Sequence, residues 1–168
     1  MISGPTFSAP RNRPSARQRL LDTARTLFYR QGVTNVGIDL ILQESGVAKA
    51  TLYKHFASKD ELILEFMRQG DVRWLSWLQG ATEAREPKPE RRLLAVFDTL
   101  AEWFALPHFR GCLLTNVATE LADPGHQAHA LLREHKERVR AYLEELAGAA
   151  ARRPRTRARR CTRRPGCR

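Results

Sequence analysis

Helical periodicity is the feature that most restricts how this chain can fold. Apolar residues recur every three or four positions in successive segments, and no segment alternates apolar and polar residues as a half-buried strand does. With 168 residues and a hydrophobic composition of 42%, the chain is long enough to bury a core. We therefore expect an all-α fold.

Capping residues mark the first two predicted helices. Ser15 with Gln18 three positions later is typical of a capping box, and the apolar periodicity that follows runs to Gly32. Gly37 begins a second, short helix that ends near Gly46. Before the first helix, residues 1–13 combine prolines, small polar residues and arginines, which predicts a disordered basic arm.

Five further helices are predicted after a tight turn at Gly46. The third spans about residues 48–55, where Leu52 and Phe56 lie four residues apart as inward anchors and leave polar and basic side chains on the other faces. Ser58 would cap a long fourth helix that extends toward Gly80. The remaining helices are expected within residues 91–106, 110–123 and 126–151.

Positive charge is concentrated at the C-terminal end. The net charge is +11, and nine arginines without one acidic residue lie in residues 152–168. The other 151 residues carry 20 basic and 18 acidic groups. An argument for nucleic-acid binding must therefore rest on local placement of charge and not on the total.

Membrane and secreted classes are disfavoured. No stretch has the roughly eighteen continuous apolar residues of a membrane span, and the N-terminal segment lacks the apolar centre of a secretory signal. Cys112, Cys161 and Cys167 form neither an even disulfide framework nor a paired zinc pattern. We expect a cytoplasmic protein without a membrane partner.

The segment around the third helix carries a dense set of polar and basic side chains. They are Lys49, Thr51, Tyr53, Lys54, His55 and Lys59. Two short helices joined at a glycine and supported by a preceding helix are typical of a helix-turn-helix, whose second helix enters the major groove of DNA. Such side chains reach phosphate oxygens and base edges. On charge alone, the solvated face of an ordinary helical bundle is the better explanation.

The order of the residues favours DNA binding. The stretch "GVAKATLYKHFASKDEL" strongly resembles the DNA-binding signature of the tetracycline-repressor-like (TetR) family of regulators, through Gly46-Val47, Leu52-Tyr53 and Phe56 with the following Lys59. The upstream "RLLDTARTLFYRQGVTNVGIDLI" also resembles the first helix of that family and the entry to its second. We expect residues 14–74 to form a DNA-binding domain of this type, with the motif at about residues 37–56.

The resemblance implies phosphate contacts that set the register on DNA. Tyr53, His55 and Lys59 would make these contacts, with Lys54 as an additional one. For Tyr53 and His55 the competing interpretations are half-buried packing and an idle surface imidazole.

Lys49 and Thr51 would lie nearest the base edges. The family often has a hydroxyl residue at the start of the second helix, where this chain has Gly37. The resemblance therefore implies that only backbone amides would face a phosphate there.

The resemblance also implies that residues 75–151 bind a small-molecule effector and form a homodimer. A palindromic operator in double-stranded DNA has two equivalent half-sites, so two readers related by a two-fold axis are required. Aromatic side chains would line the effector pocket. The candidates are Phe66, Trp74, Trp77, Phe97, Trp103, Phe104 and Phe109. For each of them, plain core packing is the competing interpretation.

No metal or other cofactor is expected. Cys112 fits a small core residue better than a redox sensor. His126, His129 and His135 lack the thiol or carboxylate cluster that would complete a metal site.

The C-terminal tail, residues 152–168, cannot form an amphipathic helix because it combines prolines, scattered arginines and few apolar residues. TetR-family chains normally end in dimer helices. The tail is therefore either a basic DNA-binding arm or the product of a reading-frame shift in a GC-rich gene, which would leave the effector and dimerisation domain incomplete. Sequencing the gene across Ala151 distinguishes the two.

The leading hypothesis is a sequence-specific transcriptional regulator, a repressor released by its effector. An enzyme is disfavoured, because the sequence has no Gly-rich phosphate loop, nucleophile elbow or acid–base constellation. The alternative is a nonspecific or architectural nucleic-acid-binding protein driven by the Arg-rich tail, whose binding would depend on salt and not on sequence.

Overall fold

Every regular element in the described part of the chain is a helix. The computed structural model describes residues 14–152, and no strand occurs within that range. The predicted all-α class is confirmed. The predicted basic arm and all but the first residue of the predicted tail lie outside the described residues. No helix in the described range is both long enough and apolar enough to cross a membrane.

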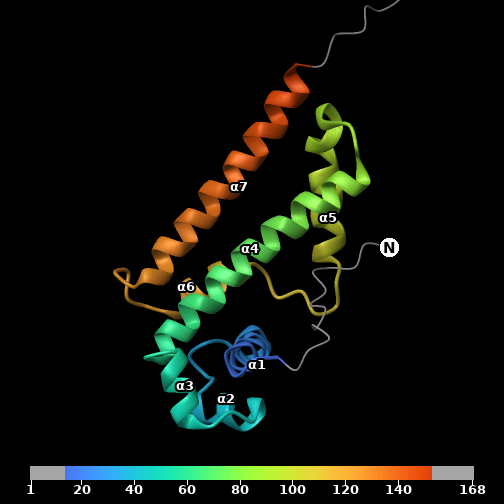
Figure 1. Ribbon diagram of the computed structural model, residues 1–168. Coiled ribbons are helices and arrows are strands. Elements are labelled where there is room, and N and C mark those ends of the chain that lie inside the picture. The colour runs from blue at the N-terminus through green and yellow to red at the C-terminus, as the bar shows by residue number, and fades with distance from the viewer. Residues whose placement is uncertain (1–13, 153–168) are drawn as a thin grey trace, which may run out of the picture.

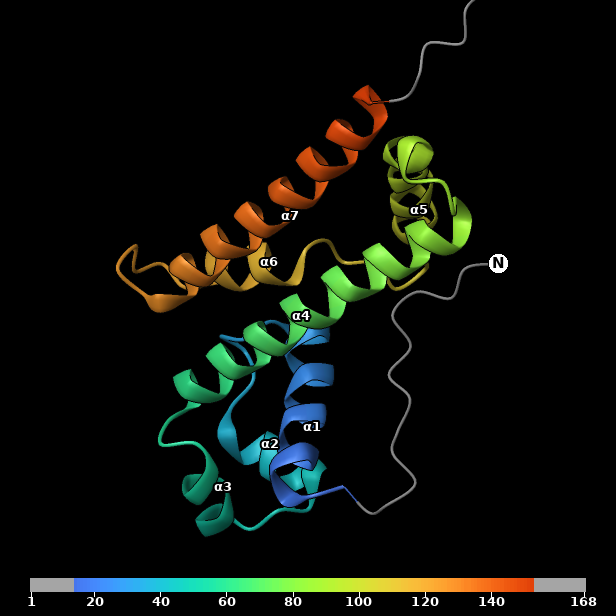
Figure 2. The same cartoon turned by 45° about the horizontal axis from the view of Figure 1, so that its top comes forward.

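Helices α1 to α3 form one end of the molecule, and α4 leads from it into the second half, where α5 and α7 pack along it (Figures 1 and 2). Helix α6 contacts both α4 and α7. The elements are α1 (Ala16–Gln31), α2 (Ile38–Ser45), α3 (Lys49–His55), α4 (Lys59–Arg85), the 3-10 helix η1 (Pro89–Arg91), α5 (Arg92–Phe104), α6 (Leu113–Glu120) and α7 (Gln127–Ala151).

The predicted ends of α1 and α2 are confirmed. The backbone N–H of Gln18 donates to Ser15 Oγ at 3.2 Å, but the Gln18 side chain donates to Asp22, so only one half of the expected capping box forms. Gly32 and Gly46 adopt φ angles of 86° and 62° at the C-terminal caps. Both glycines are used because other residues pay a steric penalty in this conformation.

Helix α4 joins the two halves without a break. The N–H of Glu61 donates to Ser58 Oγ at 3.1 Å, and the Glu61 carboxylate accepts from the Ala57 N–H at 2.5 Å, which fixes the start of the helix. The helix then runs to Arg85, beyond the expected end near Gly80. The predicted domain boundary at residue 74 falls inside it, so the two halves share a helix and are not joined by a linker.

Two apolar cores lie along α4. The first anchors α3 through Leu52 and Phe56, which are 0% and 1% exposed, and it includes Leu114 and Val117 from α6. The second lies farther along, where α4, α5 and α7 meet; its buried members are Leu78, Val96, Tyr142 and Leu146. Because α6 enters the first core, the DNA-binding half predicted from residues 14–74 is completed by residues from the second half.

Gly70 allows α6 to approach α4 closely. A Cβ atom at this position would lie 3.2 Å from Leu113 Cδ2, which is tighter than ordinary van der Waals contact. A glycine in a helix interior costs about 1 kcal/mol relative to alanine. Here the glycine leaves room for Leu113 of α6, and a larger residue would crowd that side chain.

Part of the apolar surface of α5 points outward, while Leu93 and Leu100 pack against the second core. Leu94, Phe97 and Phe104 are 75%, 62% and 53% exposed. The buried positions are instead Ala95, Val96 and Thr99. Two neighbouring faces of α5 are apolar enough to be buried, and packing against α4 and α7 selects the one that carries Val96.

Candidate nucleic-acid interface and ligand cavity

Helix α3 presents its polar side to solvent because its two apolar anchors are fully buried. Burial of Leu52 and Phe56 fixes the rotation of the helix, and Tyr53, between them in sequence, is 49% exposed. All seven candidate DNA-binding residues lie at the surface. Gly37, Lys49, Tyr53, Lys54 and His55 are exposed, and Thr51 and Lys59 are half-buried.

Arg17 holds α1 against both α3 and α4. Its guanidinium lies 5.3 Å from the centre of the Phe56 ring, and it forms an ion pair with Glu65 at 2.9 Å. The Phe56 ring, at the end of α3, is thereby tied to α1 and α4. The orientation of the exposed side of α3 is set by tertiary contacts as well as by its own sequence.

An acidic side chain lies within the candidate interface, and sequence reasoning missed it. Asp39 Oδ1 is 3.7 Å from Lys49 Nζ, with the two side chains 89% and 64% exposed. An exposed pair of this kind contributes about 0–1 kcal/mol, so a DNA phosphate or base can compete for the lysine. No side-chain hydrogen bond caps α2 at Gly37. The position of Asp39 in the first turn of α2 was the available signal.

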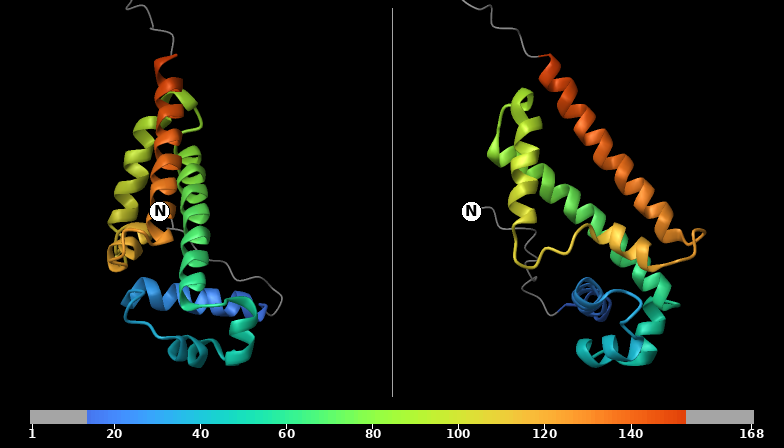
Figure 3. Two further views of the ribbon diagram at one scale, coloured as in Figure 1. Left: turned by 90° about the vertical axis from the view of Figure 1, so that its left-hand side faces the viewer. Right: turned by 180° about the vertical axis from the view of Figure 1, so that it is seen from behind.

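A cavity of about 1260 Å³ lies between the end formed by α1 to α3 and the second half of the molecule. Helices α1, α4, α5, α6 and α7 contribute to its wall, together with the segment between α5 and α6. Figure 3 shows α1 beneath the crossing of α4 and α6. The lining residues of α1 are Arg25, Thr26, Tyr29, Arg30 and Gln31, and those of α4 are Gly70, Arg73 and Trp74.

Three of the seven candidate effector-binding aromatics line this cavity: Trp74, Trp103 and Phe109. Their rings are in contact, with centroid distances of 5.7 Å for Trp74–Trp103 and 4.8 Å for Trp103–Phe109.

The other four candidates do not line this cavity. Phe66 is buried in the first core and Trp77 packs against the second. Phe97 and Phe104 lie on the outward face of α5. Helical spacing alone cannot distinguish these positions, because aromatic residues on one helix can serve a core, a cavity or a surface.

Cys112 belongs to the cavity wall, at the edge of the first core. Its Sγ lies 3.8 Å from His135 Nε2, and His135 Nδ1 donates to Asp71 Oδ1 at 2.7 Å. Arg138 also donates to Asp71, so this buried carboxylate on α4 holds two residues of α7. The interpretation of Cys112 as a small core residue overlooked this arrangement, because the residues that form it are far apart in sequence.

The Cys112–His135 pair favours a thiolate beside an imidazolium. Burial raises the pKa of the Cys112 thiol, but hydrogen bonds from His135 and Thr115 outweigh it and lower the pKa to about 6. Burial also opposes the charged form of His135, yet its bonds to Cys112 and Asp71 raise its pKa. The cavity wall therefore carries a cysteine whose surroundings favour the thiolate form.

The histidines have separate structural partners. His126 Nδ1 accepts from the Ala128 N–H at 3.1 Å at the start of α7, and its Nε2 lies 3.4 Å from Asp60. His129 Nε2 contacts the Leu121 carbonyl oxygen at 3.1 Å. Within residues 14–152, no group of three or more His, Cys, Asp and Glu side chains is arranged to hold a metal ion.

Two polar contacts couple α1 and the residues after it to the second half. Glu120 Oε2, at the end of α6, accepts from the Thr34 backbone N–H at 3.1 Å and from its hydroxyl at 3.2 Å. Tyr29 Oη accepts from the Arg110 N–H at 3.0 Å. Tyr29 and Arg110 also line the cavity, so one of these contacts lies directly at its wall.

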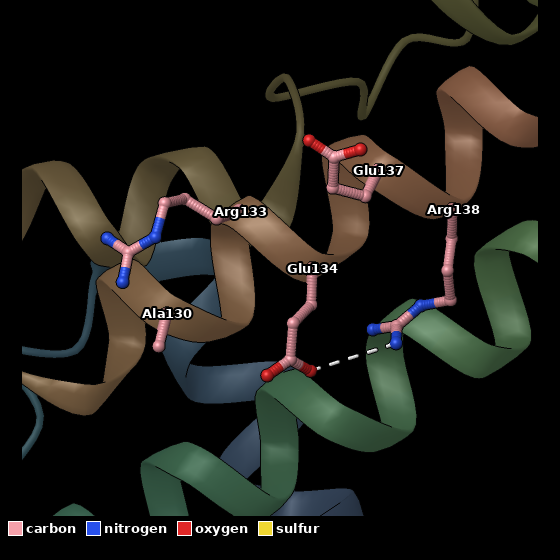
Figure 4. A pocket seen from close by; sticks show the side chains of 5 residues that line it. All are labelled: Ala130, Arg133, Glu134, Glu137 and Arg138. Atoms are coloured by element: carbon pink, nitrogen blue, oxygen red, sulfur yellow. Dashed lines mark ion pairs between the residues drawn. The ribbon is translucent and has the colours of Figure 1, made fainter.

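A second depression of about 520 Å³ lies along α7. All its lining residues come from that one helix, and Figure 4 shows Glu134 and Arg138 side by side with their 3.7 Å ion pair. The other lining residues are Ala130, Arg133 and Glu137. Its mixed charges and single-helix wall are typical of an ordinary solvated helix surface.

Comparison with known proteins decides the family. Residues 20–66 match the model described as "Bacterial regulatory proteins, tetR family", and residues 89–160 match "Tetracyclin repressor-like, C-terminal domain". A crystal structure of a TetR-family transcriptional regulator from Streptomyces coelicolor is similar with 34% identity, a TM-score of 0.72, and coverage of 81% of this chain and 75% of that one. The chain belongs to the TetR family of DNA-binding transcriptional regulators.

Other TetR-family relatives agree with this assignment. The regulatory protein TetR from Rhodobacter sphaeroides is 28% identical, with a TM-score of 0.63 and coverage of 80% of this chain and 73% of that chain. The HTH-type transcriptional regulator YjdC of Escherichia coli is 23% identical over 130 residues, or 77% of this chain and 68% of the relative. None of these matches supports the nonspecific nucleic-acid-binding alternative.

Proposed function

We propose that this TetR regulator is a repressor that binds a palindromic operator as a homodimer and releases it when a small molecule occupies the cavity. The observation that carries the proposal is the orientation of α3, whose buried Leu52 and Phe56 turn a hydroxyl-rich and basic side to solvent. That side has the groups and the size that a major groove accepts.

Roles on DNA follow from position along α3. Lys49 and Thr51, in the first turn of the helix, would approach base edges, while Tyr53, Lys54 and His55 would bind phosphates. Lys59, at the start of α4, and the backbone at Gly37 would add two further phosphate contacts. The Asp39–Lys49 pair would open when DNA binds.

Release would follow from the shared cavity wall. A ligand that contacts Tyr29 on α1 and Arg110 in the second half would act on the contact that joins the two halves. Such a ligand would bind more tightly to a conformation in which the two α3 helices of the dimer have a different separation. The operator affinity would then fall by the ratio of the ligand's affinities for the two conformations.

Selection of bound duplexes from a random pool tests the proposal directly. The expected winners contain two inverted half-sites, and light scattering should give the mass of a dimer. Enrichment of no sequence, or a monomer that binds every duplex equally at fixed salt, would contradict it. Removing residues 152–168 should lower affinity uniformly and leave the sequence preference intact.

Three substitutions separate the residues that position the protein on the DNA backbone from those that read the base sequence. Tyr53→Phe and Lys59→Ala should weaken binding to all sequences by a similar factor. Lys49→Ala should instead change the ranking of operator variants, by about 1–3 kcal/mol at the affected base pair. If all three variants bind DNA like the parent protein, the roles assigned to these residues are wrong.

A further inference from the structure

The charge of the cavity wall indicates the class of molecule that it accepts. Within the described residues the lining includes four arginines and two histidines, and no aspartate or glutamate. These residues are Arg25, Arg30, Arg73, Arg110, His108 and His135. In contrast, residues 1–151 as a whole are close to electrical neutrality. The positive wall is therefore a local feature, and it favours an anionic ligand.

Carboxylates near the wall compensate only part of this charge. Asp22 pairs with Arg25 at 2.6 Å, and Asp71 is engaged by His135 and by Arg138. Arg73 donates to the neutral side-chain oxygen of Gln69 at 2.6 Å. All these groups have protein partners, so they are held in place before a ligand arrives.

Arg25 of α1 and Arg73 of α4 repel each other across the cavity wall. Burial lowers the pKa of Arg25, the ion pair with Asp22 raises it, and the charge of Arg73 lowers it further. Both guanidinium groups line the same cavity, and a guanidinium anchors a planar anion well because it can donate two parallel hydrogen bonds.

The rest of the wall suits an aromatic body. Trp74, Trp103 and Phe109 form a continuous group of ring contacts, and Tyr29 lies on the α1 side. At about 1260 Å³, the cavity has room for more than one ring.

We propose that the cavity binds an aromatic carboxylate, with the carboxylate held by Arg25 and Arg73 and the ring packed against Trp74, Trp103 and Phe109. This inference rests on the proposed function for its regulatory meaning, although binding itself does not require DNA. An anion between α1 and α4 would relieve the Arg25–Arg73 repulsion and draw those two helices together.

Isothermal titration calorimetry on the full chain without DNA tests the inference. The probe is naphthalene-1-carboxylate, and the matched control is naphthalene-1-carboxamide, which has nearly the same shape but no charge. We expect the carboxylate to bind at least tenfold more tightly. Equal binding of the two probes, or no heat from the carboxylate at millimolar concentration, would overturn the proposal.

Two variants locate the anchor. Arg73→Gln should weaken carboxylate binding at least tenfold and leave amide binding unchanged. Arg133→Gln, which removes an exposed positive charge of α7 that does not line the cavity, should change neither. Equal losses in both variants would indicate long-range attraction and contradict a specific anchor. Arg73→Lys should retain part of the affinity, and thermal melting of each variant verifies that it is folded.

Operator binding separates this inference from the proposed function. If the carboxylate binds the chain but leaves operator affinity unchanged, the cavity assignment stands and effector release fails. If an uncharged molecule releases the operator and carboxylates do not bind, the proposed function as a ligand-released repressor is supported and the proposed anionic ligand class is wrong.

Discussion

The candidate DNA-binding surface and the cavity differ in how the chain builds them. The seven DNA-binding candidates lie within residues 37–59, and they reach the surface through local helix geometry and two buried anchors. The cavity wall takes residues from Arg25 to His135 and has no continuous sequence signature. A local surface can be identified from residue order, whereas an assembled cavity depends on how distant helices pack.

The largest effect expected from this comparison concerns the two sides of α3. Phe56→Ala should lower the free energy of unfolding by about 3–5 kcal/mol, because Phe56 is 1% exposed and its removal leaves a cavity. Tyr53→Ala, on the exposed side, should change it by about 0.5 kcal/mol or less while weakening DNA binding. Urea denaturation measures the first quantity and duplex titration the second. Similar destabilisation by both variants would show that α3 has no distinct buried and reading sides.

The next effect sharpens the description of the cavity wall. With a pKa of about 6, the Cys112 thiol should be roughly nine-tenths thiolate at pH 7, and its alkylation by iodoacetamide should rise through a midpoint near pH 6. His135→Ala should move this midpoint upward, because the thiolate loses its hydrogen-bond donor. Mass spectrometry of the peptide that contains Cys112 separates it from Cys161 and Cys167. Lys136→Ala, at an exposed neighbouring position, is the control. A midpoint near 9 in the parent chain would refute the pairing.

A smaller effect tests the contact between the two regions. Tyr29→Phe removes the oxygen that accepts from the Arg110 N–H and should cost about 0.5–1.5 kcal/mol of stability. If this contact transmits effector binding, the variant should also show a reduced change in operator affinity at saturating ligand. Thermal melting and duplex titration with and without ligand measure the two quantities. Unchanged coupling would assign transmission to other contacts, such as that of Glu120 with Thr34.

The smallest expected effect lies within the candidate interface. Asp39→Asn removes a negative charge beside Lys49 and should tighten DNA binding a few-fold at low salt, with less gain at high salt. Stability should change by about 0.5 kcal/mol or less. Titration of one duplex at two salt concentrations measures the effect. Weaker binding in the variant would indicate that Asp39 itself positions Lys49 for reading.

The sequence by itself determined the all-α class, the caps at Ser15, Ser58 and Gly46, and the inward anchors of α3, because capping chemistry and helical spacing act within a few residues. It also indicated the family, through the ordered residues of one motif.

Only the tertiary structure decided which aromatics line the cavity, which face of α5 is buried, and that Cys112 meets His135 and Asp71. These outcomes depend on the packing of helices that are distant in sequence. Similar apolar spacing can fill a core or face solvent, and a polar group acquires its chemistry from neighbours that only the fold brings within reach.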